Sequence, residues 1–313
     1  MDFTLKTYIR LLKTLKSHNY TFLPFSDYIQ LYNQSTSPIH PPSTSPSLPI
    51  IILRHDVDKL PQNALRFAQI EYRLCIRGTY YFRIVPQSFN PVIIEKIAGL
   101  GHEIGYHYED IDFAAQNHKI KDKRKKIKIE DLCSLAIESF QKNLETLRKI
   151  APVKTICMHG SPLSKFDNKL LWKYYNYKDF GIIGEPYFEV DFLKVLYLTD
   201  TGRRWNGGKF SIRDKGLGIR KQELGYPYQD WVVKPKVGSL MRMTEKGIEF
   251  QSKYNFRSTN DIIRAAENGE LPDKIMMTFH PQRWTDKVVP WVKELVWQNV
   301  KNVGKWVLIR IRQ

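Results

Sequence analysis

Along most of the chain, short apolar runs alternate with longer blocks whose apolar residues recur at helical spacing. The runs suit buried strands and are too short for helices, whereas the block at 61–73 begins with Pro61, which fits the first turn of a helix. Such repeated strand–helix units favour a parallel α/β architecture. Predicted strands lie at 49–54, 79–84, 103–107, 154–158, 194–198 and 274–279, and predicted helices at 61–73, 91–98, 131–150 and 291–303.

Two segments before residue 50 differ from this pattern. Residues 1–34 mix Lys and Arg with apolar residues and predict an N-terminal helical segment, which we expect to pack on the body of the protein. Residues 35–49 are rich in Ser and Pro, which oppose both helix and sheet, and they predict a linker or long loop. Residues 50–313 then form the main domain.

Composition and charge narrow the class of protein. Of 313 residues, 42% are apolar and 13% aromatic, which excludes intrinsic disorder over most of the chain. Lys plus Arg is 49 and Asp plus Glu is 32, so the net charge is +17. This charge is diffuse apart from residues 119–128, and no nucleic-acid-binding motif accompanies it, so we expect no nucleic-acid partner.

Other features bear on the cellular setting. No apolar stretch is long enough to cross a bilayer, and the N-terminus lacks the apolar core of a secretory signal, so we expect no membrane span and a cytoplasmic location. Cys75, Cys133 and Cys157 have no paired spacing, which argues against a disulfide framework or a Cys-type zinc site. The oligomeric state stays open.

Ionisable residues collect directly after four predicted strands. These tails are Arg54–Asp58 (RHDVD), His107–Asp110 (HYED), His159–Pro162 (HGSP) and His280–Trp284 (HPQRW). In parallel α/β folds the carboxyl ends of the strands converge on the functional site. Four of the eight histidines lie in these tails, so the sequence predicts one shared pocket.

The first tail carries Asp56 and Asp58, which project to the same side of an extended backbone. Two adjacent carboxylates repel each other unless a cation separates their roles. A divalent metal on one of them, with the other free as a base, resolves the conflict, and Asp with His suits zinc or a similar ion. The alternative is an Asp-rich turn that caps the next helix, with Arg54 pairing one carboxylate.

Two other histidines have structural roles in this interpretation. His55 faces away from Asp56 and Asp58 and supports the site from behind, and His102 forms buried hydrogen bonds. Polar, aromatic segments at 184–187, 199–205 and 282–285 offer contacts for sugars or anionic groups, with ordinary loop chemistry as the alternative. The candidate substrate-binding residues there are Arg203, Trp205, Arg283 and Trp284.

These motifs resemble those of the polysaccharide deacetylases, the carbohydrate esterase family 4 group. The matching segments are RHDVD at 54–58, GTYYFR at 78–83, GHEIGYH at 101–107, His159–Pro162 and Phe279–Pro281. They extend over about residues 50–165 and 275–282. The resemblance implies an α/β fold of the distorted, incomplete (β/α) barrel type, to which this chain adds its N-terminal helical segment.

The resemblance also implies roles for individual residues. Asp56 would be the catalytic base, Asp58 and His107 metal ligands, and His280 the general acid. The chain departs from the family at Ile111, where a second histidine is usual.

The third ligand must therefore come from elsewhere or be missing. Glu109, Asp110 and Asp112 are local candidates, and His159, at the end of a neighbouring strand, is the preferred one.

The implied activity is that of a metal-dependent hydrolase. It would remove an acetyl group from an N-acetylated sugar or glycan intermediate, with a divalent metal, expected to be zinc, as cofactor and the acetylated saccharide as partner. Three alternatives stay open. They are an amidohydrolase acting on a small non-sugar amide, a carbohydrate-binding relative that has lost the metal, and a protein that binds an anionic polymer through residues 119–128.

Overall fold

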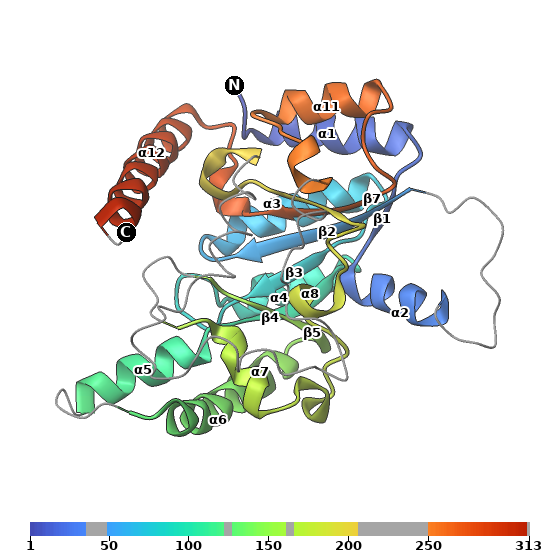
Figure 1. The fold of residues 1–313 in the computed structure, drawn as a ribbon. Helices are drawn as coiled ribbons and strands as arrows, with labels where there is room; N and C mark the ends of the chain where they lie inside the picture. Colours follow the sequence, from blue (N-terminus) through green and yellow to red (C-terminus); the bar gives the residue numbers. More distant parts are fainter. Residues whose placement is uncertain (36–48, 122–126, 161–165, 206–249, 312–313) are drawn as a thin grey trace.

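Seven parallel strands form the sheet at the centre of the molecule (Figure 1). The computed structural model describes residues 1–35, 49–121, 127–160, 166–205 and 250–311. The sheet order is β5-β4-β3-β2-β7-β6, with β1 also paired to β2. The strands are β1 (Thr21–Leu23), β2 (Ile50–Val57), β3 (Thr79–Phe82), β4 (Glu103–Tyr108), β5 (Val153–Met158), β6 (Leu196–Thr199) and β7 (Lys274–Phe279).

Strand β2 is the central element of this sheet. It pairs with β7 along one side, and along the other side with β1 through its first residues and with β3 through its last ones. All of its residues after Ile50 are buried, as expected for a parallel strand covered on both faces. The strand is longer than the predicted 49–54, so it carries His55 and Asp56 within the sheet and ends just before Asp58.

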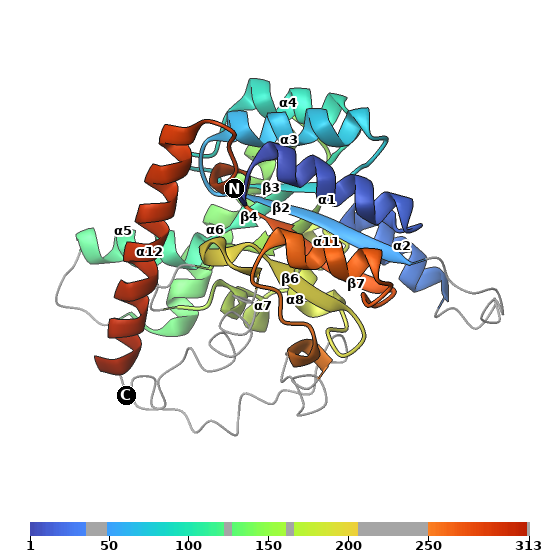
Figure 2. The same ribbon diagram turned by 90° about the horizontal axis from the view of Figure 1, so that it is seen from above.

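Helices lie on both sides of the sheet, and several pack in pairs (Figures 1 and 2). Helix α1 lies beside α11, α3 beside α4, and α5 beside α6. The helices are α1 (Leu5–Ser17), α2 (Phe25–Ser35), α3 (Pro61–Arg73), α4 (Pro91–Gly99), α5 (Asp110–Lys121), α6 (Ile129–Arg148), α7 (Leu171–Tyr174), α8 (Pro186–Glu189), α11 (Thr259–Glu267) and α12 (Val288–Ile311). Short 3-10 turns are η1 (Asn168–Leu170), η2 (Tyr177–Phe180), η3 (Thr201–Arg203) and η6 (Pro281–Arg283).

The N-terminal segment contributes a strand as well as helices. The sequence predicted helix for residues 1–34, but β1 lies between α1 and α2 and pairs with the start of β2. Three residues are too few to display an alternating pattern, which is why β1 escaped prediction. The segment packs on the body through Tyr8, Leu11, Leu12 and Leu15, which α1 buries.

Two predicted segments fall mostly outside the described residues. They are the Ser/Pro-rich linker at 35–49 and the basic stretch at 119–128. In the five ranges that the structure describes, the helices all lack the combination of length and apolar character that crossing a membrane requires.

The parallel sheet is compatible with a barrel-like arrangement. Beyond β5, an isolated bridge joins Thr155 to Gly184, so a further extended segment follows on the outer side of that strand. The carboxyl ends of the strands lead to the same end of the sheet, because all pairings are parallel. This end carries the polar tails of the sequence.

Candidate functional site

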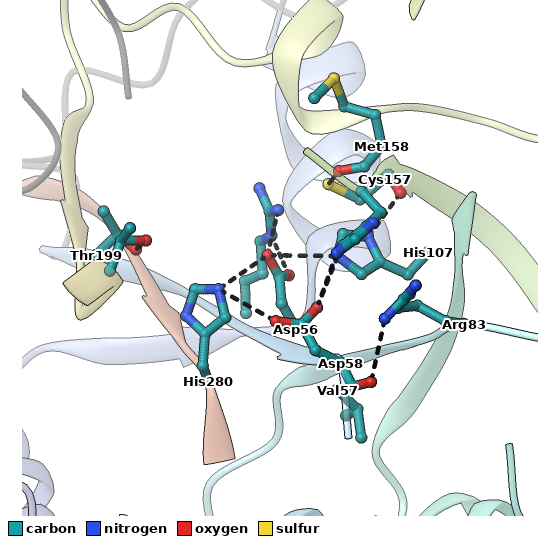
Figure 3. Close-up of polar contacts among 12 residues, drawn as sticks. Asp56, Val57, Asp58, Arg83, His107, Cys157, Met158, Thr199 and His280 are labelled. Atoms are coloured by element: carbon teal, nitrogen blue, oxygen red, sulfur yellow. Dashed lines mark hydrogen bonds and ion pairs between the residues drawn. The ribbon is translucent and has the colours of Figure 1, made fainter. Parts of the chain in front are cut away.

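Five predicted site residues meet at the carboxyl ends of β2, β4, β5 and β7. Figure 3 shows four of them, with His107 and His280 on opposite sides of the two aspartates. The Nε2 atom of His107 lies 3.8 Å from Asp56 Oδ2 and 3.6 Å from Asp58 Oδ1. His159 Nε2 lies 3.6 Å from Asp58 Oδ1. His280 Nε2 lies 4.0 Å from Asp56 Oδ2 and 3.9 Å from Asp58 Oδ2.

Asp56 is held by a buried arginine. Arg54 donates from Nε to Asp56 Oδ1 and from Nη2 to Asp56 Oδ2, both at 2.7 Å. Burial alone would raise the pKa of Asp56, but the attraction of Arg54, followed by that of His107, outweighs burial and holds this pKa well below its usual range. Asp56 is therefore an anion with a fixed orientation.

The alternative role for the two aspartates is an Asp-rich turn that caps the next helix, with Arg54 pairing one carboxylate. The pairing with Arg54 forms, but the helix cap does not. The residue that caps α3 is Leu60, and it makes no side-chain capping hydrogen bond. Arg54 also contacts the rings of Tyr81 and Tyr187, whose centroids are 5.7 and 5.4 Å from its guanidinium carbon. The bidentate pairing and the two ring contacts hold Arg54 in place.

Asp58 has one oxygen satisfied and one without a hydrogen-bond partner. Its Oδ2 accepts a hydrogen bond from Gln282 Nε2 at 3.0 Å. Its Oδ1 is buried and accepts none, although it faces the Nε2 atoms of His107 and His159. A buried carboxylate oxygen without a donor is costly, so this atom indicates a place for a cation or a bound group.

The second nitrogen of His107 fixes its tautomer. His107 Nδ1 lies 2.9 Å from the carbonyl oxygen of Cys157, to which it donates. Burial lowers the pKa of His107, which favours the neutral ring with an unprotonated Nε2. A nitrogen lone pair that faces Asp58 Oδ1 repels it unless a cation lies between the two atoms. Backbone support of this kind is typical of histidines that bind metals.

His159 is oriented by a carboxylate that an arginine holds in turn. Its Nδ1 lies 2.9 Å from Glu109 Oε2. Arg83 donates to both oxygens of Glu109 at 2.6 and 2.7 Å, and its Nη1 donates to the carbonyl oxygen of Asp58 at 3.3 Å. Burial would raise the pKa of Glu109, but hydrogen bonding and charge from His159 and Arg83 lower it, so Glu109 is ionised.

The other local candidates for the third ligand face elsewhere. Asp110 accepts hydrogen bonds from Tyr106, Ser139 and Asn143, and Asp112 accepts one from Asn168 Nδ2. Ile111 lies in the hydrophobic core.

Two of the distances at Asp58 are close to those of a metal site. In a tetrahedral zinc site with bonds of 2.0–2.1 Å, ligand atoms are about 3.3 Å apart. The two separations of 3.6 Å from Asp58 Oδ1 to the imidazole nitrogens lie close to that value.

Among the described residues, the group whose three ligand atoms all lie within 4.8 Å of one another is a different one, Asp56, His107 and Cys157, which is buried and could hold a metal ion. The spacing of the cysteines in the sequence argued against a cysteine ligand. The position of Cys157 near the end of β5 was the one feature that could have indicated such a ligand. In this group both oxygens of Asp56 already bind Arg54, whose charge opposes a cation.

His280 is paired with a carboxylate that sequence reasoning missed. Its Nδ1 lies 2.5 Å from Asp200 Oδ1, and its backbone N–H donates to Asp200 Oδ2 at 2.9 Å. Burial would raise the pKa of Asp200, but His280 and Arg283 lower it, so Asp200 is ionised. Asp200 directly follows β6, the same position after a strand that marks the other site residues.

The predicted substrate-binding tryptophans are buried. Trp205 and Trp284 are 2% and 1% exposed and pack with Phe3 and Phe279. The indole N–H of Trp205 donates to Thr259, and that of Trp284 donates to Asp200. A sugar could stack on these rings only if the core opened, so their placement does not favour the predicted substrate contact.

The predicted substrate-binding arginines also have partners within the fold. Arg283 Nη1 donates to Asp200 Oδ1 at 3.0 Å and so supports the partner of His280. Arg203 lies 5.1 and 4.5 Å from the ring centroids of Phe3 and Trp291 and donates to the carbonyl oxygen of Trp291. Substrate contact by either arginine stays a prediction.

Behind the site, the predictions for His55 and His102 are confirmed. His55 Nε2 lies 2.9 Å from Glu71 Oε1 on the far side of β2, and its ring stacks on that of Tyr80. His102 accepts a hydrogen bond from the backbone N–H of Gly78, and its other ring nitrogen contacts the carbonyl oxygen of Ala68. Neither ring faces the aspartates of the site.

Comparisons with protein-family models, with curated proteins and with solved structures found no match for this chain. Its chemistry is therefore inferred from the side chains at the carboxyl ends of the strands. They comprise a fixed carboxylate, an imidazole backed by a second carboxylate, and a buried group of ligand atoms that could hold a metal ion.

Proposed function

We propose that this chain is a metal-dependent hydrolase that removes an acetyl group from an N-acetylated sugar or glycan intermediate. The observation that carries the proposal is the buried Asp58 Oδ1, which lacks a hydrogen bond and lies 3.6 Å from the Nε2 atoms of both His107 and His159. Together with the motifs, this arrangement supports a distorted, incomplete barrel of the polysaccharide deacetylase type. We propose zinc as the ion, because Asp and His donors suit it.

Asp58, His107 and His159 would hold the cation. Once bound, a divalent ion supplies a more acidic water molecule and polarises the carbonyl group of the substrate. Glu109 keeps His159 turned toward Asp58, and the Cys157 carbonyl does the same for His107. In this proposal His159, at the end of the neighbouring strand, takes the role of the second histidine. The family usually has that histidine at the position of Ile111.

Asp56 and His280 would move the protons of the reaction. Asp56 is a weak base because Arg54 stabilises its anion, so it accepts a proton only from a water molecule that is itself acidic. The water oxygen bonds to the acetyl carbon, the carbon–nitrogen bond breaks, and acetate leaves. His280 donates a proton from Nε2 to the departing amine, while Asp200 holds Nδ1 and stabilises the charged ring.

Metal analysis of the purified protein tests the ligand set. After zinc is supplied, we expect about one ion per wild-type chain and loss of the ion in Asp58→Ala, His107→Ala and His159→Ala. The exposed His18 offers a matched control, since His18→Ala should keep the metal. Cys157→Ser separates the two groups of ligands, because it keeps the ion in our proposal and loses it if Cys157 is a ligand. Absence of metal from the wild type contradicts the proposal.

Turnover tests the reaction itself. Asp56→Asn should keep the metal and lose at least about 100-fold in acetate release from N-acetylated sugars, because the amide cannot accept the proton. The same assay on small non-sugar amides distinguishes the deacetylase from an amidohydrolase. A wild type that holds metal but cleaves neither class of substrate contradicts the catalytic part of the proposal.

A further inference from the structure

The outer face of α12 carries a cluster of exposed apolar side chains. Among the described residues, fourteen large apolar side chains are exposed, and six of them lie between residues 288 and 300. The other eight are scattered over the rest of the chain, as is ordinary for a protein surface. The cluster consists of Val288, Val289, Val292, Val296, Trp297 and Val300.

The spacing of this cluster places most of it on one face of the helix. Val289, Val292, Val296 and Val300 follow one another at intervals of three and four residues. The opposite face holds the helix to the body, where Trp291 Nε1 donates to the carbonyl oxygen of Asp2 at 2.6 Å. In Figure 1, α12 stands at the edge of the molecule with no other labelled element on its outer side.

The sequence that follows this cluster is positively charged. The helical backbone continues to Ile311, and the sequence from 301 to 313 contains Lys301, Lys305, Arg310 and Arg312 with no acidic residue. Within the described part, Glu294 lies 3.7 Å from Lys59. An apolar face followed by a basic segment is typical of helices that lie in the interface of an anionic membrane.

We propose that α12 docks the protein on an anionic bilayer, with the apolar face at 288–300 buried among the lipid headgroups. Two arguments favour a bilayer over a second copy of the chain. Each copy carries a net charge of +17, so two copies repel each other, whereas acidic lipids attract the protein. The exposed Trp297 also suits the boundary between headgroups and acyl chains, where tryptophan is enriched.

Vesicle flotation with the full chain tests this proposal. The probes are vesicles of phosphatidylcholine alone and vesicles with about 30% phosphatidylserine, the latter carrying the surface charge that attracts basic segments. We expect at least about tenfold tighter binding to the anionic vesicles, and weaker binding in about 0.5 M salt, which screens the attraction.

A double variant, Val296→Gln with Val300→Gln, isolates the contribution of α12. Both positions are exposed and glutamine is a good helix former, so the fold should persist and circular dichroism can verify it. We expect binding to anionic vesicles to fall about tenfold, because two apolar anchors are lost. The control is Val92→Gln on α4, where the valine is similarly exposed, and it should bind like the wild type.

Three results would overturn the proposal. The first is a wild type that does not bind anionic vesicles, as expected if another part of the chain covers α12. The second is equal binding by the double variant, which would assign the affinity to diffuse charge. The third is a dimer in sedimentation velocity that the double variant dissociates, which would assign the face to a second copy.

Discussion

Asp56 and Asp110 show how strongly the surroundings of one residue type set its charge. Both carboxyl groups are buried. Asp56 binds the cationic Arg54, whereas the described residues that donate to the Asp110 carboxylate are the neutral Tyr106, Ser139 and Asn143. Without a cation to offset it, burial raises the pKa of Asp110 to about 6.

The raised pKa of Asp110 predicts a specific pH dependence of stability. The folded protein binds this proton more tightly than the unfolded chain, in which the carboxyl group has its ordinary pKa of 3.8. The resulting stabilisation is fully present below about pH 4 and is lost as the pH rises to about 6. Asp110→Asn should abolish this component, so wild type should lose about 2 kcal/mol relative to the variant between pH 4 and pH 7.

Urea denaturation of both proteins at several pH values measures this difference. The asparagine keeps an oxygen for Ser139 and Asn143, so the variant should fold. A difference in unfolding free energy that stays constant from pH 4 to pH 7 would mean that Asp110 is ionised throughout, contrary to the prediction.

At the scale of single residues, the sequence predicted which side chains meet at the site better than it predicted the residues that pair with them. The tails after the strands predicted that Asp56, Asp58, His107, His159 and His280 would meet, and the structure brings their side chains together. Asp200 lies directly after a strand, as the other site residues do, but its pairing with His280 joins residues far apart in the sequence and leaves no local pattern. Polarity alone could not reveal that Trp205 and Trp284 belong to the core.

Among the elements, the contact of β3 with β4 depends on the absence of a side chain at Gly105. A Cβ atom there would lie 2.3 Å from two ring atoms of Tyr81 and 3.1 Å from the carbonyl oxygen of Thr155. The Tyr81 ring cannot move freely, because it is fully buried and its hydroxyl donates to the side chain of Thr155.

We therefore expect Gly105→Ala to lower the free energy of unfolding by about 1–3 kcal/mol, the usual cost of overpacking. Gly99, the last residue of α4, is a matched control because a Cβ atom there would meet nothing within 4 Å. Gly99→Ala should be neutral or slightly stabilising. Equal stability of the two variants in urea denaturation would show that the sheet adapts to the added methyl group.

Elements with strong local signals were predicted well. Helix α3 has the predicted bounds, with a proline in its first turn, and β7 also matches its prediction. Elements without such signals were missed. Strand β1 is too short to show a period, and α5 has no clear separation of polar and apolar faces. The barrel-like closure of a sheet depends on pairings that no single segment encodes.

For the whole molecule, the N-terminal segment is part of the main core. The Tyr8 ring stacks on Phe67 of α3 at 4.1 Å, its hydroxyl donates to Glu71, and Leu12 is fully buried. We expect Leu12→Ala to cost about 3 kcal/mol of unfolding free energy while the protein keeps a single unfolding transition.

Lys13, the exposed neighbour of Leu12, provides the control, because Lys13→Ala should change the free energy of unfolding little. Circular dichroism and tryptophan fluorescence should report the same midpoint in each variant. Two separate transitions, of which Leu12→Ala shifts only one, would instead mean that residues 1–34 fold as an independent unit.

The pairing of β2 with β7 has a consequence for biosynthesis. Ile50 lies beside Lys274, so β2 cannot pair with β7 until more than two hundred further residues have left the ribosome. Asp56 and Asp58 emerge early, whereas His280 emerges only after β7. A nascent chain halted before this point would leave one side of its central strand unpaired and would lack His280, so the sheet and the site should be completed in the same late folding step.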